Sequence, residues 1–319
     1  MLQTISSFVT AHAPQVLVTV ALVVYSLSKK KLTPDGIAAA IVTAVIHMLH
    51  PWSVFFYLLV TFFMAGTIAT KVHHKQKALL TQSSQGGSGG EASHGRSAAQ
   101  VFANALPAGL LILLDVYLHY SGTPSSSVSS YFTSFFSSSA KTTSELVLPV
   151  GIICSYAAAT ADTLSSELGI LSPSAPFLIT QPWKSVPKGT NGGVTITGLA
   201  WGLFGGFLTG VTSILLLPSS VFSSESLTKL RLVAGVSVAG LFGSVLDSVL
   251  GAVCQATVED KASGRVVEGE NGRRVLVGAG AGGSRVQRGM DLLNNNGVNF
   301  AMAMGTGAVG MLVFAGLAS

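Results

Sequence analysis

Two stretches of the chain place acidic side chains among apolar residues. Asp162 and Glu167 lie in the sequence ATADTLSSELG, and Asp247 lies in GLFGSVLDSVLG. An ionisable side chain is costly inside a membrane-spanning helix and therefore marks a candidate functional site. Carboxylates are hard oxygen ligands that suit Mg²⁺, which binds a few of them together with substrate phosphates. We therefore predict that Asp162, Glu167 and Asp247 hold a magnesium ion.

Helical spacing brings further polar groups beside these carboxylates. Ser166 follows Asp162 by four residues, so the two share a helix face, and Glu167 lies close enough to border the same cavity. Ser248 adjoins Asp247, and Gln255 shares the face of Asp247 two turns later. Two plainer interpretations stay open: a helix end that reaches water would explain Glu167, and a structural hydrogen bond would explain Asp247.

A glycine-rich loop follows the first acidic stretch and reads WKSVPKGTNGG over residues 183–193. Backbone N–H groups in such a turn, next to a helix N-terminus, form an anion site, and lysines add positive charge. The order of Lys and Gly differs from that of a Walker A motif. A plain turn with solvated lysines is the alternative. The candidate phosphate-binding residues are Lys184, Lys188, Gly189, Thr190, Asn191, Gly192 and Gly193.

A third polar motif, DLLNNNGVN, begins at Asp291 and precedes the last apolar stretch. Helix capping accounts for one or two of its asparagines but leaves Asn299 unexplained, because that residue already lies within the apolar segment. We expect Asn294, Asn295 and Asn299 to orient a phosphate or a base.

The composition excludes a soluble protein. Only 10% of the 319 residues are charged and 49% are hydrophobic, with a mean hydropathy of +0.58, whereas soluble domains carry about 25% charged residues. No dense basic stripe with interleaved aromatics indicates nucleic-acid binding. The two cysteines, Cys154 and Cys254, lie in apolar runs and should be free thiols. We therefore predict an all-α, polytopic membrane helix bundle that forms one integral membrane domain over residues 1–319, with possible homo-oligomers.

Apolar stretches near the ~20 residues of a membrane span occur eight times. They are residues 8–28, 36–49, 52–70, 101–120, 146–168, 193–217, 231–254 and 298–317. The sixth carries glycines at four-residue spacing (198, 202, 206 and 210), which favours close helix packing.

Eight spans would place 15 of the 18 Lys and Arg residues on one side of the membrane. The positive-inside rule makes that side cytosolic, so both termini would be non-cytosolic and the candidate active site would lie at the cytosolic face. The expected membrane is the endoplasmic reticulum or another endomembrane. Between spans we expect a flexible linker at 81–97, a Ser-rich non-cytosolic loop at 121–144 and a mobile cytosolic loop at 259–289.

The motifs described above resemble those of the TMEM19/DUF92 family of integral membrane proteins, which includes the plant phytyl-phosphate kinase. The resemblance covers about residues 31–70 and 98–317, with the motifs in the family's order. It rests on ADT at 161–163, SELG at 166–169, VPKGTNGG at 186–193, the stretch from Gly243 to Gln255, and the asparagines from Asn294 to Asn299. The family usually has an Asp-Asn-Asn run near the last helix, where this chain has Asn294 in place of the Asp.

This resemblance implies a Mg²⁺-dependent lipid-phosphate kinase. It would transfer a phosphoryl group from CTP, or secondly ATP, to a phytyl, farnesyl or geranylgeranyl monophosphate in the bilayer. Asp162, Glu167, Asp247 and Lys188 would be catalytic. An ion-coupled transporter or lipid flippase is the alternative, because such proteins also use intramembrane carboxylates. The crowding of polar residues at one face and the lack of an internal repeat favour the kinase. A non-catalytic scaffold would leave the buried carboxylates unexplained.

Overall fold

The computed structural model describes residues 2–83, 95–120, 141–222, 226–268, 275, 277 and 285–317. In these residues the chain is an all-α bundle with a few short strands, as predicted. Its helices are α1 (Leu2–Ala11), α2 (Ala13–Ser28), α3 (Pro34–Met48), α4 (Val54–Lys71), α5 (His74–Lys77), α6 (Ala98–Tyr120), α8 (Lys141–Gly169), α9 (Ile196–Leu216), α10 (Ser226–Cys254) and α11 (Asn295–Leu317), with a 3₁₀ turn at Ser219–Val221.

Six helices of the described chain are long and apolar enough to cross a membrane, namely α4, α6, α8, α9, α10 and α11. Helices α2 and α3 are apolar but shorter. The 15 residues of α3 rise only about 22 Å, against a hydrocarbon core of about 30 Å. The eight predicted stretches are mostly helical and follow the expected order, although the first is divided between α1 and α2 and the sixth begins in a strand at Gly193–Val194, and the count of eight spans is not confirmed.

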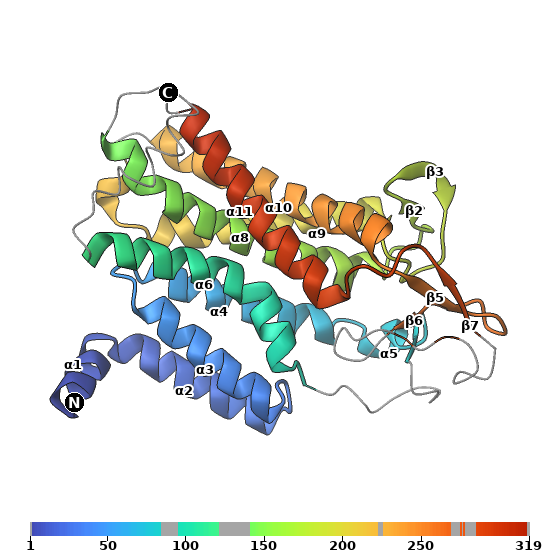
Figure 1. Cartoon of the computed structure of the whole chain (residues 1–319), viewed down its shortest axis with the longest axis horizontal. Coiled ribbons are helices and arrows are strands. Elements are labelled where there is room, and N and C mark those ends of the chain that lie inside the picture. The colour runs from blue at the N-terminus through green and yellow to red at the C-terminus, as the bar shows by residue number, and fades with distance from the viewer. Residues whose placement is uncertain are drawn as a thin grey trace.

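Helix α8 forms the centre of the bundle and packs against α4, α6, α9, α10 and α11 (Figure 1). Its small residues Ala157, Ala158 and Ala161 are fully buried, so neighbouring backbones approach closely. The glycine stripe on α9 has the predicted packing role. A Cβ at Gly206 would lie 2.7 Å from the Ser237 carbonyl of α10, and one at Gly198 would lie 3.2 Å from the Ser165 carbonyl of α8.

The two chain ends lie at the same end of the bundle, and the strands lie at the other (Figure 1). Strands β2 (Phe177–Leu178), β3 (Gln181–Ser185) and β4 (Gly193–Val194) form an antiparallel sheet in the order β3-β2-β4. Strand β1 (Gln82–Ser83) pairs in parallel with β6 (Val267–Glu268), and β5 (Thr257–Asp260) pairs antiparallel with β7 (Arg285–Arg288). We refer to this part of the molecule as the strand end.

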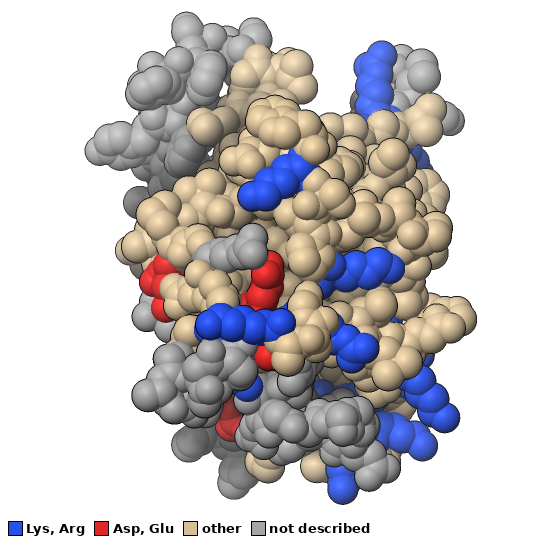
Figure 2. Space-filling view, turned by 90° about the vertical axis from the view of Figure 1, so that its right-hand side faces the viewer, with Lys and Arg blue, Asp and Glu red and all other residues tan. Residues whose placement is uncertain are grey.

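The predicted loops are more structured than expected where the structure describes them. The 259–289 segment, expected to be a mobile loop, has flanks that form β5, β6 and β7. Residues 269–274, 276 and 278–284 of that segment lie outside the described chain, as do 84–94 of the predicted linker and 121–140 of the Ser-rich loop. Figure 2 faces the strand end and shows Lys and Arg side chains spread over it, with a few acidic side chains among them.

Candidate functional site

A cavity of about 850 Å³ reaches the strand end of the bundle, where Val194 of β4, Thr257 of β5 and Gln287 of β7 are among the residues that line it. Its size is within the range of small-molecule sites. Every predicted site residue except Lys184 lines it. These residues are Asp162, Ser166, Glu167, Lys188, Gly189, Thr190, Asn191, Gly192, Gly193, Asp247, Ser248, Gln255, Asn294, Asn295 and Asn299.

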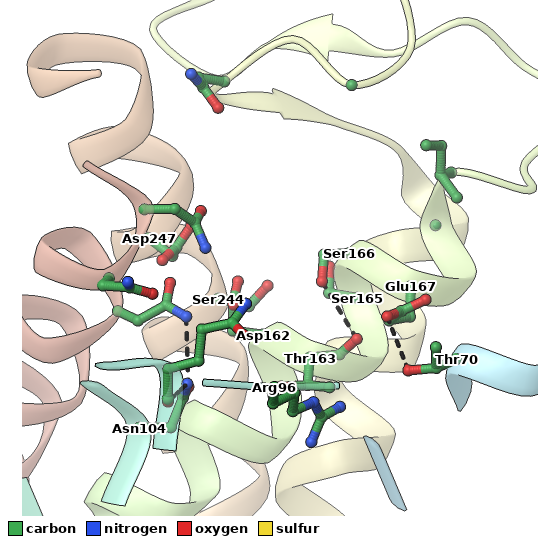
Figure 3. Close-up of a pocket in the computed structure, with 18 of the residues that line it drawn as sticks. Thr70, Arg96, Asn104, Asp162, Thr163, Ser165, Ser166, Glu167, Ser244 and Asp247 are labelled. Carbon is green, nitrogen blue, oxygen red and sulfur yellow. Dashed lines mark hydrogen bonds between the residues drawn. The ribbon is translucent and has the colours of Figure 1, made fainter. Parts of the chain in front are cut away.

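Asp162 of α8 and Asp247 of α10 lie close together in the cavity wall (Figure 3). Both are half-buried, and they are near enough for their charges to repel each other. Neither has a Lys, Arg or His within ion-pair distance among the residues that the structure describes. Two adjacent carboxylates without a cationic neighbour form a site that favours a bound cation.

Glu167 has a different environment from the two aspartates. Its Oε2 accepts a hydrogen bond from Lys77 Nζ of α5 at 2.7 Å, and its Oε1 accepts one from Thr70 Oγ1 of α4 at 3.0 Å. Within the described chain no three acidic, His or Cys side chains come together as a metal site. Of the three predicted carboxylates, Glu167 is therefore paired with a lysine from a short neighbouring helix, whereas Asp162 and Asp247 have no basic partner in the described chain.

Asn299 connects α11 to this carboxylate pair. Its Nδ2 lies 3.4 Å from Oδ1 of Asn104 on α6. In the opposite amide orientation its nitrogen donates to Asp247 Oδ2 at 3.3 Å and to the Asn295 carbonyl at 3.1 Å, which satisfies both polar atoms of the amide. Asn294 instead caps α11, since its Oδ1 accepts from the Gly297 N–H at 2.9 Å.

The glycine-rich turn is fixed by its own backbone. Gly189 and Gly192 have φ of +85° and +77°, a region that side chains disfavour. The Thr190 N–H donates to the Pro187 carbonyl at 3.2 Å, and the Gly193 N–H donates to the Thr190 carbonyl at 2.9 Å.

The same turn is held against neighbouring segments. The Asn191 N–H donates to Thr257 Oγ1 at 3.1 Å, and its Nδ2 donates to the Ala256 carbonyl at 2.9 Å. A Cβ at Gly192 would lie 2.7 Å from the Ser248 carbonyl of α10. Several of the N–H groups expected to bind phosphate are therefore already bonded within the protein, and the turn forms a rigid wall of the cavity.

The two lysines of this loop differ in position. Lys188 is half-buried in the cavity wall, and its Nζ donates to the Ser172 carbonyl at 2.6 Å. Lys184 lies on β3, where every residue is exposed, and it does not line the cavity. The structure therefore does not place Lys184 where it could assist Lys188.

One wall of the cavity is apolar. It is formed by α2, α3 and α4 and includes Leu22, Val23, Ala40, Ala44, Phe56, Leu59, Val60 and Phe63. Helix α3 contacts α2 and α4 less extensively than α8 contacts its neighbours, so the apolar wall lies at the less tightly packed side of the bundle. The cavity thus combines a polar chamber with a hydrophobic extension, which fits an amphiphilic molecule.

Arg96, Lys77 and Thr70 are among the polar cavity residues that were not predicted as site residues. Arg96 and Lys77 belong to the positive charges of the loops, and such charges flank most membrane helices. No spacing or neighbouring motif distinguishes them in the sequence. Asn104 is also in the lining, and a buried amide early in an apolar helix is the one signal that could have identified it.

Comparison with known proteins relates the chain to a family of integral membrane proteins. The family model for the integral membrane protein family DUF92 matches residues 17–307. Protein PGR of Arabidopsis thaliana is 33% identical over 282 residues, which is 86% of each chain. The uncharacterized membrane protein MJ0933 of Methanocaldococcus jannaschii is 41% identical over 104 residues, 33% of this chain and 39% of that protein. No solved structure matches the chain. The chain belongs to the DUF92 family of integral membrane proteins.

Proposed function

We propose that this protein is an isoprenyl monophosphate kinase, which transfers a phosphoryl group from CTP or ATP to a membrane-embedded prenyl monophosphate. One observation carries the proposal: a single cavity joins Asp162, Asp247 and Lys188 to an apolar wall formed by α2, α3 and α4. An anionic lipid has the matching chemistry, with a charged headgroup and a hydrocarbon tail.

The donor set in the cavity fits Mg²⁺. Asp162 and Asp247 supply hard carboxylate oxygens and have no basic partner in the described chain. They would hold the ion, with the Asn299 amide positioning Asp247. When bound, Mg²⁺ would supply neutralisation of the charge on the phosphates.

The rest of the chemistry is positioning. A monophosphate acceptor is already largely ionised, so its oxygen can attack the terminal phosphorus of the nucleotide without a strong general base. The new bond joins that oxygen to the phosphorus, and the bond to the bridging oxygen breaks to release CDP or ADP. Lys188 would hold the nucleotide phosphates, and the rigid turn from Gly189 to Gly193 would limit water access to them.

The apolar wall gives the acceptor its orientation. A prenyl chain lying against Phe56, Leu59 and Phe63 of α4 would exchange lipid contacts for an equally apolar surface, so the wall would orient the chain through packing and not through transfer from water. This contact would place the headgroup at the boundary between the apolar wall and the polar chamber. Farnesyl, geranylgeranyl and phytyl monophosphates all have this form.

The test is direct phosphoryl transfer. Purified protein in detergent should convert farnesyl, geranylgeranyl or phytyl monophosphate to the labelled diphosphate when given Mg²⁺ and CTP or ATP labelled at the terminal phosphate. Addition of EDTA should stop the reaction. No transfer to any of the three acceptors with either nucleotide, from protein shown to be folded, would contradict the proposal and favour an ion-coupled transporter or flippase.

A further inference from the structure

Arg96 is held in place through its backbone. Its N–H donates to the Lys31 carbonyl at 2.9 Å, and its carbonyl accepts from the Thr33 N–H at 3.1 Å and from Thr33 Oγ1 at 3.2 Å. The residue also forms a parallel bridge with Leu32. Because these bonds fix Arg96 on the segment between α2 and α3, its side chain enters the cavity from a defined point just before α6.

The guanidinium lies against the backbone of α4. A Cβ built at Gly66 would be 2.8 Å from Nη2 and 3.3 Å from Nη1 of Arg96. The methyl group of Thr163 on α8 lies 3.2 Å from the same point. Figure 3 shows Arg96 beside the segment of α8 that carries Asp162, Thr163 and Glu167. The absence of a side chain at Gly66 therefore provides the space that the guanidinium occupies.

This guanidinium has no partner in the described part of the chain. It makes no hydrogen bond there and no ion pair within 4 Å, and Glu167, whose charge acts on it, is already bound by Lys77. Burial lowers the pKa of Arg96 below its usual value, the negative charge of Glu167 offsets part of this, and the guanidinium keeps its proton at neutral pH. A guanidinium withdrawn from water with its donors unused is costly unless an anion binds it.

The position of Arg96 indicates which kind of anion it would bind. Phe63 of the apolar wall lies three residues before Gly66 on α4, and Asp162 of the polar chamber precedes Thr163, which lies beside Gly66, on α8. Arg96 therefore contacts α4 between a residue of the apolar wall and the segment of α8 that carries Asp162. Lys188 belongs to the loop before β4, on the nucleotide side of our proposal.

We propose that Arg96 binds the phosphate of the prenyl monophosphate acceptor. This inference rests on the proposed function and names the headgroup contact of the same site. The planar fork of arginine can donate two parallel hydrogen bonds to a phosphate, which a neutral alcohol cannot accept in the same way. Arg96 would therefore select a phosphorylated lipid over the free prenol and set the acceptor oxygen toward the nucleotide.

Binding without nucleotide tests the inference separately from catalysis. Equilibrium binding of tritiated farnesyl monophosphate and of tritiated farnesol should be measured on purified wild type, Arg96→Gln and Arg96→Lys. We expect Arg96→Gln to weaken farnesyl monophosphate binding by about 10- to 100-fold, Arg96→Lys to weaken it less, and farnesol binding to change by less than about twofold. Arg231→Gln, on the exposed surface of α10, is the charge-matched control and should bind like wild type.

Gly66→Ala provides a second variant that leaves every charge in place. Its methyl group would lie 2.8 Å from Nη2 and displace the guanidinium, so farnesyl monophosphate affinity should again fall. Gly235→Ala on α10 is the matched control, because nothing lies within 4 Å of its added Cβ. Size-exclusion elution and thermal unfolding check that each variant is folded.

The outcomes separate the two proposals. Arg96-dependent binding of farnesyl monophosphate without any phosphoryl transfer would support this inference and contradict the kinase. Farnesyl monophosphate affinity that is unchanged in both Arg96→Gln and Gly66→Ala would overturn the inference, as would a loss confined to CTP and ATP affinity. Wild-type protein that binds farnesyl monophosphate no better than farnesol would overturn it as well.

Discussion

Lys77 and Glu167 form an ion pair in the lining of the cavity, with 2.7 Å between Lys77 Nζ and Glu167 Oε2. Lys77 also donates to the Ala69 carbonyl at 2.7 Å, which fixes α5 against the end of α4. The pair is largely shielded, with side-chain exposures of 12% for Lys77 and 29% for Glu167. Glu167 thus attaches a short helix to the end of α8 instead of joining the two aspartates.

Glu167→Gln should therefore affect stability more than catalysis. We expect it to lower the unfolding temperature while reducing the phosphoryl-transfer rate by less than about tenfold. A double-mutant cycle with Lys77→Met, read by thermal unfolding, should give a coupling energy of about 0.5–3 kcal/mol. If Glu167→Gln abolishes transfer as fully as Asp162→Asn, Glu167 acts with the two aspartates as a metal ligand and is more than the partner of Lys77.

Asp162→Asn and Asp247→Asn should each reduce the transfer rate by roughly two orders of magnitude or more, because the phosphates lose electrostatic neutralisation. Both variants should stay folded, since neither carboxylate has a basic partner in the described chain. Transfer assays across a Mg²⁺ titration, with unfolding curves, measure both effects.

Asp115→Asn is the matched control for these two variants. Asp115 lies near the end of α6 away from the strands and contacts His50 Nε2 at 2.8 Å. Its replacement should destabilise the protein by on the order of 1–3 kcal/mol and leave the transfer rate unchanged. Equal loss of transfer in Asp115→Asn and Asp162→Asn would mean that the aspartates act only through folding.

The two lysines of the glycine-rich loop should behave differently. Lys188→Ala removes a charge-assisted contact to the nucleotide phosphates. The nucleotide should lose about 1.5–3 kcal/mol of binding free energy, and its KM should rise. Lys184→Ala should change that KM much less, because Lys184 is on the exposed face of β3 outside the cavity. Nucleotide titrations at saturating lipid give both values, and equal effects of the two substitutions would refute the distinction.

Much of the site was predictable because membrane burial restricts what polar residues can do. Asp162, Asp247 and Asn299 are predictable from sequence, since ordinary packing does not explain a carboxylate or amide within an apolar span. The ion pair between Lys77 and Glu167 was not predictable, because it depends on where the four residues of α5 fold back.

Other features depended on tertiary structure in the same way. Arg96 looks like any basic residue beside a membrane helix, and only the space above Gly66 distinguishes it. The exposure of Lys184 follows from the path of β3. The backbone bonding of the glycine-rich turn depends on Thr257 and Ala256, residues more than sixty positions away.

Side-specific labelling tests the orientation of the bundle. In a background with Cys154 and Cys254 changed to Ser, Lys184→Cys at the strand end should react with a membrane-impermeant maleimide only from the cytosolic side. Ser219→Cys, in the connection between α9 and α10, should react only from the opposite side. If both positions react from the same side, the chain does not cross the membrane an odd number of times between them. If position 184 reacts from the non-cytosolic side, the orientation of the bundle is the reverse of the predicted one.

The most direct test of the central claim compares two acceptors that differ only in their phosphate. Wild-type protein with Mg²⁺ and nucleotide labelled at the terminal phosphate should be given farnesyl monophosphate or farnesol at equal concentration, and the labelled products should be separated by thin-layer chromatography. The account predicts labelled farnesyl diphosphate from the monophosphate and little labelled product from farnesol, because the alcohol lacks both the ionised nucleophile and the group that Arg96 would bind. Efficient phosphorylation of farnesol with none of the monophosphate, or no labelled product from either, would contradict it.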